Sequence, residues 1–274
     1  MTAFNAEIAS KILEVIREAG KIVRSADRHR ATGELGIQNK GTAMGDFANL
    51  VTEYDKGVQA FLIDKFTHII PDAHFIGEED GVFAEQTREG LCFVIDPIDG
   101  TTNFVCGMGR SAISVGIIEN GAPLFGAVLN PYSDELYYAT RGCGAYMNGR
   151  PIHVSDDSID HSIVTLGTSP YYKAEMGEQT LEMFRRVFYA AADIRRMAAA
   201  ALDICDVAAG RISAFCELQL SPWDFAAGAV ILTEAGGYIT DFDGNALDLD
   251  TPSCVLCSTP ATKNTMLELL RGIK

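Results

Sequence analysis

Apolar residues near the start of the chain recur every three or four positions. Between residues 4 and 24 they are Ile8, Ile12, Val15, Ile16, Ala19 and Val23. This period predicts an amphipathic helix. A second helix, ending before Pro71, is predicted from Val58, Phe61, Leu62 and Phe66. The pattern fails between the two, at residues 25–49, where glycines stand among polar residues. We expect a mobile loop or an irregular hairpin there.

The middle of the chain has the pattern of β-strands. Short strands are expected at 75–80 and 91–95. Apolar runs at 111–119 and 124–130 are joined by Asn120-Gly121, a hairpin signal. Further runs follow at 135–140 and 144–147, before a second turn at Asn148-Gly149. We interpret this region as an antiparallel meander.

Strands and helices alternate in the rest of the chain. Strands are predicted at 162–166, 212–218, 238–242 and 255–257, and helices at 176–192, 197–209, 223–235 and 262–271. Leu181, Phe184 and Val187 are expected on one face of the first of these helices. The alternation predicts layered α/β sheets. We expect one compact unit with an N-terminal subdomain, 1–150, and a C-terminal subdomain, 151–274.

Composition narrows the class of protein. Hydrophobic residues make up 47% and charged residues 22% of 274 residues, as in ordinary globular proteins. No apolar run is long enough to span a membrane, and no signal-peptide pattern starts the chain. Seven cysteines, an odd number, suggest reduced thiols. We therefore expect a cytoplasmic protein without a membrane partner.

The net charge of −15 opposes binding to nucleic acid, which needs a basic surface. It does not oppose an anionic substrate if bound Mg²⁺ supplies local positive charge.

One stretch carries the most specific chemistry. The strand at 91–95 leads into Asp96-Pro97-Ile98-Asp99-Gly100-Thr101-Thr102. Two carboxylates, a glycine that permits close backbone approach and two hydroxyls suit a hard cation that in turn holds a phosphate. The alternative is a simple Asp/Gly turn. The acids Glu78, Glu79 and Asp80 also follow a predicted strand and could converge on the same site. Asp224 lies in the first turn of a predicted helix, where the helix dipole alone would favour an acid.

Three motifs together resemble the inositol monophosphatase family. They are Gly77-Glu78-Glu79, the stretch from Asp96 to Phe104, and Trp223-Asp224-Phe225-Ala226-Ala227-Gly228 with Glu234-Ala235-Gly236-Gly237. The resemblance covers nearly the whole chain. It implies a five-layered α/β/α/β/α sandwich, a homodimer, and a Mg²⁺-dependent, often lithium-sensitive phosphomonoesterase with two or three Mg²⁺ per active site.

The resemblance also assigns roles to residues. Glu78, Asp96 and the carbonyl of Ile98 would hold one metal, and Asp96, Asp99 and Asp224 a second. The residues assigned to catalysis are Glu78, Asp55 and Thr101, the last two orienting the attacking water. The positions that would contact substrate are Asp99, Gly100, Thr101, Ala200, Glu217 and Asp224. Gly100 and Thr101 would do so through their backbone N–H groups, and Glu217 would face substrate hydroxyls.

Several positions depart from the family pattern. Ala198 and Ala199 stand where Gly and then Ser or Thr are common, Cys106 where His is common, and Arg110 replaces an aromatic residue. Asn49 stands where an Asp often precedes Leu50. No departure removes a metal ligand. Together, however, the departures leave open which substrate is hydrolysed and whether a third, weaker metal binds.

The sequence therefore predicts hydrolysis of a small polyol or sugar phosphate, with inositol 1-phosphate as the default. Alternatives within the superfamily are a fructose-1,6-bisphosphatase and a 3′-phosphoadenosine 5′-phosphate nucleotidase. A regulatory partner protein without enzymatic activity is an alternative of another class. Aspartyl-phosphate phosphatases are disfavoured because their acids stand two residues apart, whereas Asp96 and Asp99 are three apart. A P-loop kinase is excluded by the lack of its glycine-rich motif.

Overall fold

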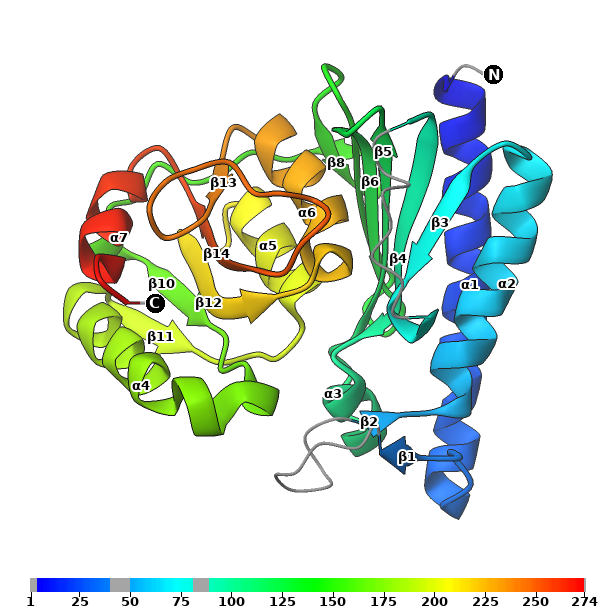
Figure 1. Cartoon of the computed structure of the whole chain (residues 1–274), viewed down its shortest axis with the longest axis horizontal. Coiled ribbons are helices and arrows are strands. Elements are labelled where there is room, and N and C mark those ends of the chain that lie inside the picture. Colours follow the sequence, from blue (N-terminus) through cyan, green and yellow to red (C-terminus); the bar gives the residue numbers. More distant parts are fainter. Residues whose placement is uncertain (1–3, 40–49, 81–88, 274) are drawn as a thin grey trace.

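Two large β-sheets and three layers of helices alternate in the computed structural model, which describes residues 4–39, 50–80 and 89–273 (Figure 1). Helices α1 (Ala6–Thr32) and α2 (Glu53–Ile69) cover the outer face of the first sheet. Helices α5 (Ala200–Ala208) and α6 (Pro222–Glu234) lie between the sheets. Helices α4 (Lys173–Ala190) and α7 (Lys263–Leu270) cover the second sheet. The expected five-layered α/β/α/β/α sandwich is confirmed.

The first sheet is seven-stranded, in the order β3-β4-β5-β6-β7-β8-β9. Its strands are β3 (His74–Gly77), β4 (Leu91–Asp99), β5 (Ala112–Glu119), β6 (Ala122–Asn130), β7 (Glu135–Thr140), β8 (Ala145–Met147) and β9 (Arg150–Pro151). β3 is parallel to β4, and every later pair is antiparallel. The structure thus has the predicted meander, with β4 reaching further than expected, through Pro97 to Asp99.

The second sheet is five-stranded, in the order β11-β10-β12-β14-β13. Its strands are β10 (Ile163–Leu166), β11 (Asp193–Arg195), β12 (Ala214–Leu220), β13 (Tyr238–Thr240) and β14 (Ser253–Ser258). β10 pairs in parallel with β11 and β12, and β14 pairs antiparallel with β12 and β13. The edge strand β11 was not predicted, because its sequence, Asp-Ile-Arg, is too short and polar to show a strand pattern.

The N-terminal helix is longer than its apolar pattern predicted. α1 continues past residue 24 to Thr32 and ends where Gly33 adopts a φ of 76°. In the added turns Ala26 is buried, and Arg30 donates from Nε to the carbonyl of Phe104 (2.9 Å). The prediction of a loop at residues 25–32 is therefore wrong. β1 (Gln38–Asn39) pairs antiparallel with β2 (Leu50–Val51), as an irregular hairpin would. Residues 40–49, including Asn49, lie outside the described residues.

The buried face of α4 also differs from the prediction. Thr180, Met183 and Val187 are buried against the second sheet, whereas the side chain of Leu181 is 65% exposed. One residue along a helix is a rotation of about 100°, so a stripe through 180, 183 and 187 turns Leu181 toward solvent. The predicted position of Leu181, on the same packed face as Val187, is therefore wrong, whereas Val187 is buried.

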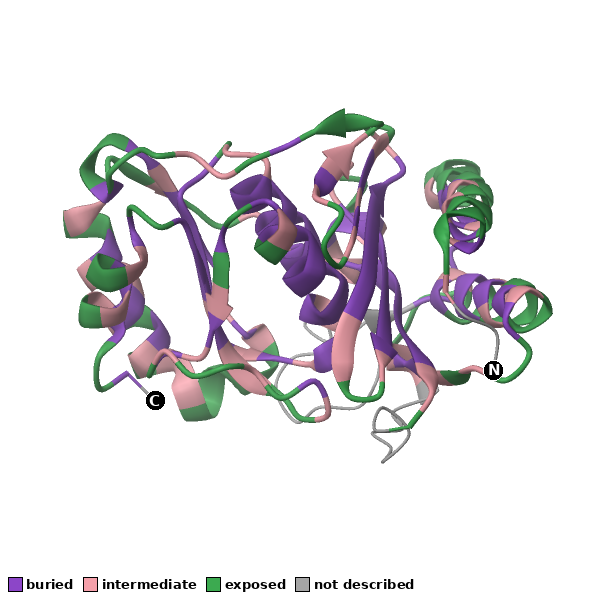
Figure 2. Cartoon of the chain, turned by 90° about the horizontal axis from the view of Figure 1, so that it is seen from above, coloured by how far each residue is buried: buried purple, intermediate pink, exposed green. Residues whose placement is uncertain are grey.

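The central helix layer is buried on nearly all sides because it packs between the two sheets (Figure 2). α6 lies directly against β5 and β6 at two glycines. A Cβ at Gly126 would come within 2.1 Å of the carbonyl oxygen of Ala227, and one at Gly116 within 3.0 Å of the Cβ of Ala226. This close approach brings the first turn of α6 to the end of β4.

All seven cysteines are free thiols. Within the described ranges, none of the helices has both the length and the apolar character needed to cross a lipid bilayer. A division into subdomains 1–150 and 151–274 remains a prediction.

Candidate active site

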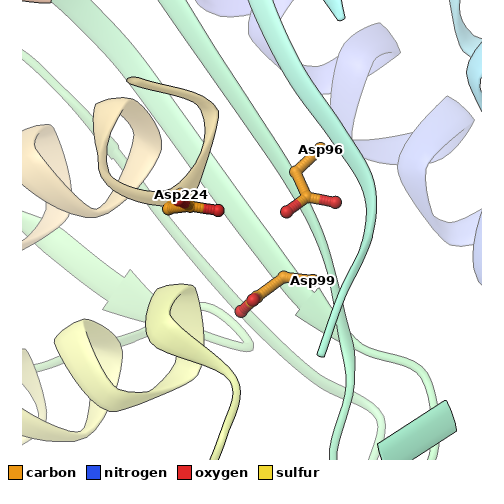
Figure 3. Close-up of side chains that lie close together, drawn as sticks. All are labelled: Asp96, Asp99 and Asp224. Atoms are coloured by element: carbon orange, nitrogen blue, oxygen red, sulfur yellow. The ribbon is translucent and has the colours of Figure 1, made fainter. Parts of the chain in front are cut away.

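Three aspartates from two distant segments meet at the end of β4. Asp96 and Asp99 belong to β4, and Asp224 lies in the first turn of α6. One carboxylate oxygen from each residue lies within 4.8 Å of the others. Figure 3 shows the three side chains pointing toward one another. The Asp pair after the predicted strand and Asp224 of the predicted helix thus meet at one place.

An irregularity in β4 lets both of its aspartates face the same way. Residues three apart on a regular strand point to opposite faces of a sheet. Asp96 pairs with Ser114 and Asp99 with Ala112, so three steps on β4 match two steps on β5. Such a bulge reorients side chains. The backbone N–H of Ile98 donates to Oδ1 of Asp96 (3.0 Å) within the irregular segment.

Helix starts hold two of the carboxylates. Asp224 is the third residue of α6, and its Oδ2 accepts a hydrogen bond from the backbone N–H of Ser221 (2.7 Å) as part of a capping box. Asp99 accepts from the first amides of α5, from Ala200 at 3.3 Å and from Ala201 at 2.9 Å. Ala200 therefore lies beside the cluster and contacts Asp99 through its backbone, while its contact with substrate remains a prediction.

Burial and mutual repulsion raise the pKa values of all three acids. Burial is the main cause for each, and the negative charge of Glu78 adds to it. The pKa of Asp99 rises to about 7. Buried carboxylates that repel one another need a cation or protons. An oxygen-only donor set of this kind fits a hard divalent ion such as Mg²⁺.

Glu78 and Ile98 lie at the same site, although the group of three oxygens consists of aspartates alone. Glu78 opens the 3₁₀ turn η1 (Glu78–Asp80) directly after β3, lines the cavity and is half-buried. The carbonyl of Ile98 accepts a hydrogen bond from the hydroxyl of Thr101 (3.2 Å). The structure therefore brings together the five groups that the resemblance assigns to metal binding.

Asp55 lies fully buried behind Thr101. Its Oδ2 accepts from the N–H and the hydroxyl of Thr52, at 2.7 and 2.6 Å, which caps α2. Its Oδ1 accepts from the hydroxyl of Thr101 at 3.3 Å. Burial, followed by the charges of Glu79 and Glu78, raises the pKa of Asp55 to about 6. The predicted Asp55–Thr101 contact is present.

The carboxylates form part of the wall of a cavity of about 930 Å³. Gly100 and Thr101 lie on its wall at the start of α3 (Thr101–Cys106), where backbone N–H groups have no partner within the helix. Gly100 has a φ of 79°, and a Cβ there would meet the carbonyl oxygen of Ala198 at 2.8 Å, so glycine is required. Glu217 of β12 also lines the cavity.

Glu217 is held by a turn that the sequence did not mark. Its Oε1 accepts from the backbone N–H of Ser169 (2.7 Å) and from its hydroxyl (3.2 Å). Burial raises the pKa of Glu217. Gly167 lets the carboxylate pass, because a Cβ there would lie 1.9 Å from Oε2 of Glu217.

Several cavity residues were missed by sequence reasoning. They are Ser169, Tyr171, Lys173, Arg196 and Asp203. The first three lie in or next to the turn η4 (Pro170–Tyr172), which has no periodicity to read. Asp203 did carry a signal, since it is one of the two charged residues in the predicted helix 197–209, whose other residues are small or apolar.

Comparison with known proteins identifies the family. Residues 2–274 match the model of the inositol monophosphatase family. An inositol-1-monophosphatase from Synechocystis is 38% identical over 78% of this chain and 73% of its own length. A fructose-1,6-bisphosphatase/inositol-1-monophosphatase from Aquifex aeolicus is 38% identical over 74% of this chain and 75% of its own. The Nus factor SuhB from Escherichia coli is 34% identical, with 93% and 92% covered.

The fold is shared with solved structures as well. The extragenic suppressor protein SuhB from Bartonella henselae superposes with a TM-score of 0.87 at 27% identity, covering 97% of this chain and 99% of that one. Together with the family match over the whole chain, this shows that the protein belongs to the inositol monophosphatase family and is a phosphoric monoester hydrolase.

Proposed function

We propose that this protein is a Mg²⁺-dependent phosphatase of small polyol phosphates, with inositol 1-phosphate as the first substrate to test. The observation that carries the proposal is the group of buried, mutually repelling carboxylates Asp96, Asp99 and Asp224 at a cavity of about 930 Å³. Phosphoryl transfer depends chiefly on positioning and on neutralising charge. The site offers both.

The residues that would hold Mg²⁺ are Glu78, Asp96, Asp99, Asp224 and the carbonyl of Ile98. Bound Mg²⁺ would neutralise the phosphate and make water a better nucleophile at neutral pH. Two or three ions per site are part of the proposal. Lithium sensitivity, a homodimer and a cytoplasmic location are further predictions that come from the family resemblance and the sequence.

The protein's own groups would position the reactants. Asp55 accepts from the Thr101 hydroxyl, which leaves the oxygen of that hydroxyl free to accept a proton from the attacking water. The N–H groups of Gly100 and Thr101 would bind phosphate oxygens. Glu217, held by Ser169, would accept hydrogen bonds from substrate hydroxyls. The substrate would also contact Ala200 and the carboxylates of Asp99 and Asp224 in the wall of the cavity.

A bisphosphate is the second candidate substrate. Lys173 and Arg196 also line the cavity and would favour a second anionic group. The Aquifex aeolicus relative, whose name includes fructose-1,6-bisphosphatase, supports this candidate. A nucleotide with two phosphate groups, such as 3′-phosphoadenosine 5′-phosphate, would pair with Lys173 and Arg196 in the same way. A purely regulatory role, suggested by the Nus factor relative, would not need the carboxylate cluster.

The test is phosphate release from inositol 1-phosphate, fructose 1,6-bisphosphate and 3′-phosphoadenosine 5′-phosphate, each with Mg²⁺ and with EDTA. We expect Mg²⁺-dependent turnover that is highest for inositol 1-phosphate. Faster turnover of either other substrate would replace the polyol by that class. Turnover that persists in EDTA would contradict a metal-dependent mechanism.

A further inference from the structure

The start of α5 lacks the usual local signals of a helix start. The N-cap residue is Ala199, whose side chain cannot accept a hydrogen bond from the first turn. Ala198, just before it, has a φ of 64°, a left-handed conformation that residues other than glycine seldom adopt. The local sequence therefore does not fix where α5 begins.

Asp99 supplies the missing cap from another part of the chain. Both of its carboxylate oxygens accept backbone N–H groups from the first turn of α5, those of Ala200 and Ala201. These hydrogen bonds hold the carboxylate in one orientation. The placement of α5 and the orientation of Asp99 thus depend on each other.

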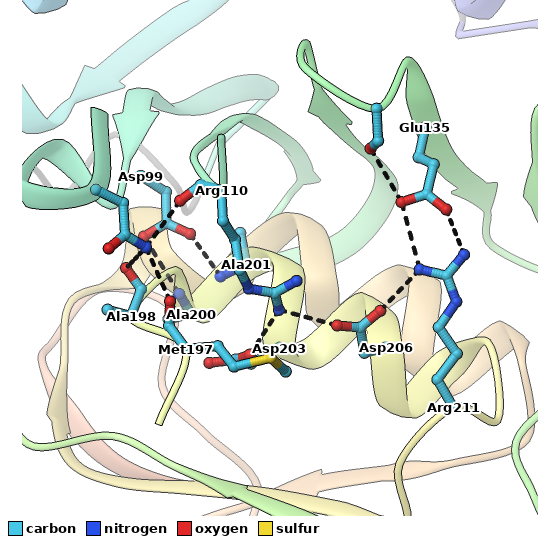
Figure 4. Close-up of polar contacts among 12 residues, drawn as sticks. Asp99, Arg110, Glu135, Met197, Ala198, Ala200, Ala201, Asp203, Asp206 and Arg211 are labelled. Carbon is cyan, nitrogen blue, oxygen red and sulfur yellow. Dashed lines mark hydrogen bonds and ion pairs between the residues drawn. The ribbon is translucent and has the colours of Figure 1, made fainter. Parts of the chain in front are cut away.

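Arg110 clamps α5 to the strand edge that carries Asp99 (Figure 4). Its Nη2 donates to Oδ1 of Asp203 (2.7 Å) and to Oδ2 of Asp206 (2.8 Å), two buried acids one turn apart on α5. Arg110 stands two residues before Ala112, the residue that pairs with Asp99. The clamp therefore begins next to Asp99 and ends just beyond the amides that bind it.

Asn103 ties the two segments together at the backbone. Its Nδ2 donates to the carbonyl of Arg110 (2.9 Å) and to that of Met197 (2.8 Å). The backbone of Arg110 is thereby fixed, so its side chain can act as a rigid link to the helix.

We propose that Arg110 is a positioning residue for metal binding: it holds the start of α5 where the amides of Ala200 and Ala201 orient the carboxylate of Asp99. This inference rests on the proposed function, because it assumes that Asp99 binds Mg²⁺. The competing explanation is that Arg110 only neutralises two buried carboxylates and so contributes to stability alone.

Arg211 provides a matched control at the other end of the same helix. Its Nη1 donates to Oδ1 of Asp206 (3.0 Å), and its guanidinium pairs with Glu135. The variants Arg110→Lys and Arg211→Lys each keep the charge and replace the planar guanidinium that bridges two carboxylates by an ammonium group of different reach and geometry. Both should lower the melting temperature. Only Arg110→Lys acts at the end of α5 that contacts Asp99.

The experiment is calorimetric titration of the wild type and both variants with MgCl₂. We expect Arg110→Lys to raise the Kd for Mg²⁺ by about tenfold or more, the usual effect of losing a group that supports a ligand. Arg211→Lys should keep the wild-type Kd. An unchanged Kd in folded Arg110→Lys would overturn the positioning role, as would an equal rise in both variants.

Asp203→Asn is the second variant, used if Arg110→Lys does not fold. It keeps the side-chain shape and weakens one contact of the clamp, so a raised Kd supports the inference and an unchanged Kd overturns it. A wild-type protein that binds no Mg²⁺ would contradict the proposed function and the inference together. Wild-type binding with no difference among the variants would contradict the positioning role alone.

Discussion

The Thr101 hydroxyl lies between the buried Asp55 and the Asp96–Asp99 segment, which we propose binds the metal. It contacts Oδ1 of Asp55 at 3.3 Å and the carbonyl of Ile98 at 3.2 Å. A hydroxyl placed in this way can pass a proton from an attacking water toward a carboxylate. The proposed reaction therefore requires the hydroxyl oxygen of Thr101 and not only a side chain of that size.

Thr101→Val should lower kcat by roughly a hundredfold or more, the usual contribution of a positioned proton-transfer group. The fold should persist, because valine has nearly the same shape. Steady-state phosphate release and a melting curve measure the two effects. Thr67→Val, at an exposed position of α2 outside the cavity lining, is the matched control and should keep the wild-type activity. Equal activity in the two variants would remove Thr101 from the mechanism.

The crowded carboxylates make stability depend on pH. The pKa of Asp99 in the folded protein is about 7, above its ordinary value of 3.8. Between these values the folded state binds a proton that the unfolded state does not, so the free energy of unfolding of the metal-free protein falls as pH rises. The Mg²⁺ that we propose for this site would bind the deprotonated carboxylates. The rise in melting temperature on adding MgCl₂ should therefore be larger at pH 8 than at pH 5, and an equal rise at both would contradict this.

The site residues that could be recognised from the sequence are those that form an unusual combination of side chains in one short stretch. Asp96, Asp99, Gly100 and Thr101 stand together in a combination with few structural explanations. Ser169 and Arg196 reach the cavity through turns and close contacts that no local pattern encodes. The Asp96–Asp99 geometry depends on the strand irregularity, which a three-residue spacing does not predict.

At the scale of single elements, the start of α5 carries measurable strain. Ala198 adopts a φ of 64°, which costs an L-residue about 1–2 kcal/mol. We therefore expect Ala198→Gly to raise the free energy of unfolding by about 1 kcal/mol in a urea titration. This is a net value, because glycine also gives the unfolded chain more entropy, which opposes the relief of strain. The control Ala201→Gly, inside α5, should lower it by about 1 kcal/mol. A loss of stability in both variants would show that Ala198 is unstrained.

Element types were predictable where apolar runs were bounded by clear start and stop signals such as proline, glycine or Asn-Gly. α2, α6 and the meander from β5 to β8 lie close to their expected positions. The end of α1 was misplaced because its last turns are held by tertiary contacts such as that of Arg30 with Phe104. The stripe on α4 was misplaced because Leu181 is an exposed apolar residue, which pattern analysis counts as buried.

At the scale of the whole molecule, close packing of the layers assembles the site. Asp224 reaches Asp96 and Asp99 because α6 lies directly on β5 and β6, where Gly116 and Gly126 leave room. The sequence predicted α/β layers from alternation, and the family resemblance supplied their number. The distance between Asp224 and the β4 aspartates required the folded structure.

Gly126→Ala should disturb this packing. Its Cβ would lie 2.1 Å from a backbone oxygen of α6, so the helix must shift. Overpacking of this kind costs about 1–3 kcal/mol, and the shift should also weaken Mg²⁺ binding at Asp224. Gly177→Ala in α4 is the control, since its Cβ would meet no atom within 4 Å. Denaturant titrations and Mg²⁺ calorimetry would compare them, and equal stability in both would contradict the tight contact.

The central claim is that the aspartate cluster binds the metal that drives phosphate ester hydrolysis. The most direct test compares Mg²⁺-dependent phosphate release from inositol 1-phosphate by the wild type and by Asp99→Asn. This substitution removes one negative charge and keeps the side-chain shape, so the variant should melt as a folded protein and have no measurable turnover. Near-wild-type turnover by folded Asp99→Asn would contradict the account.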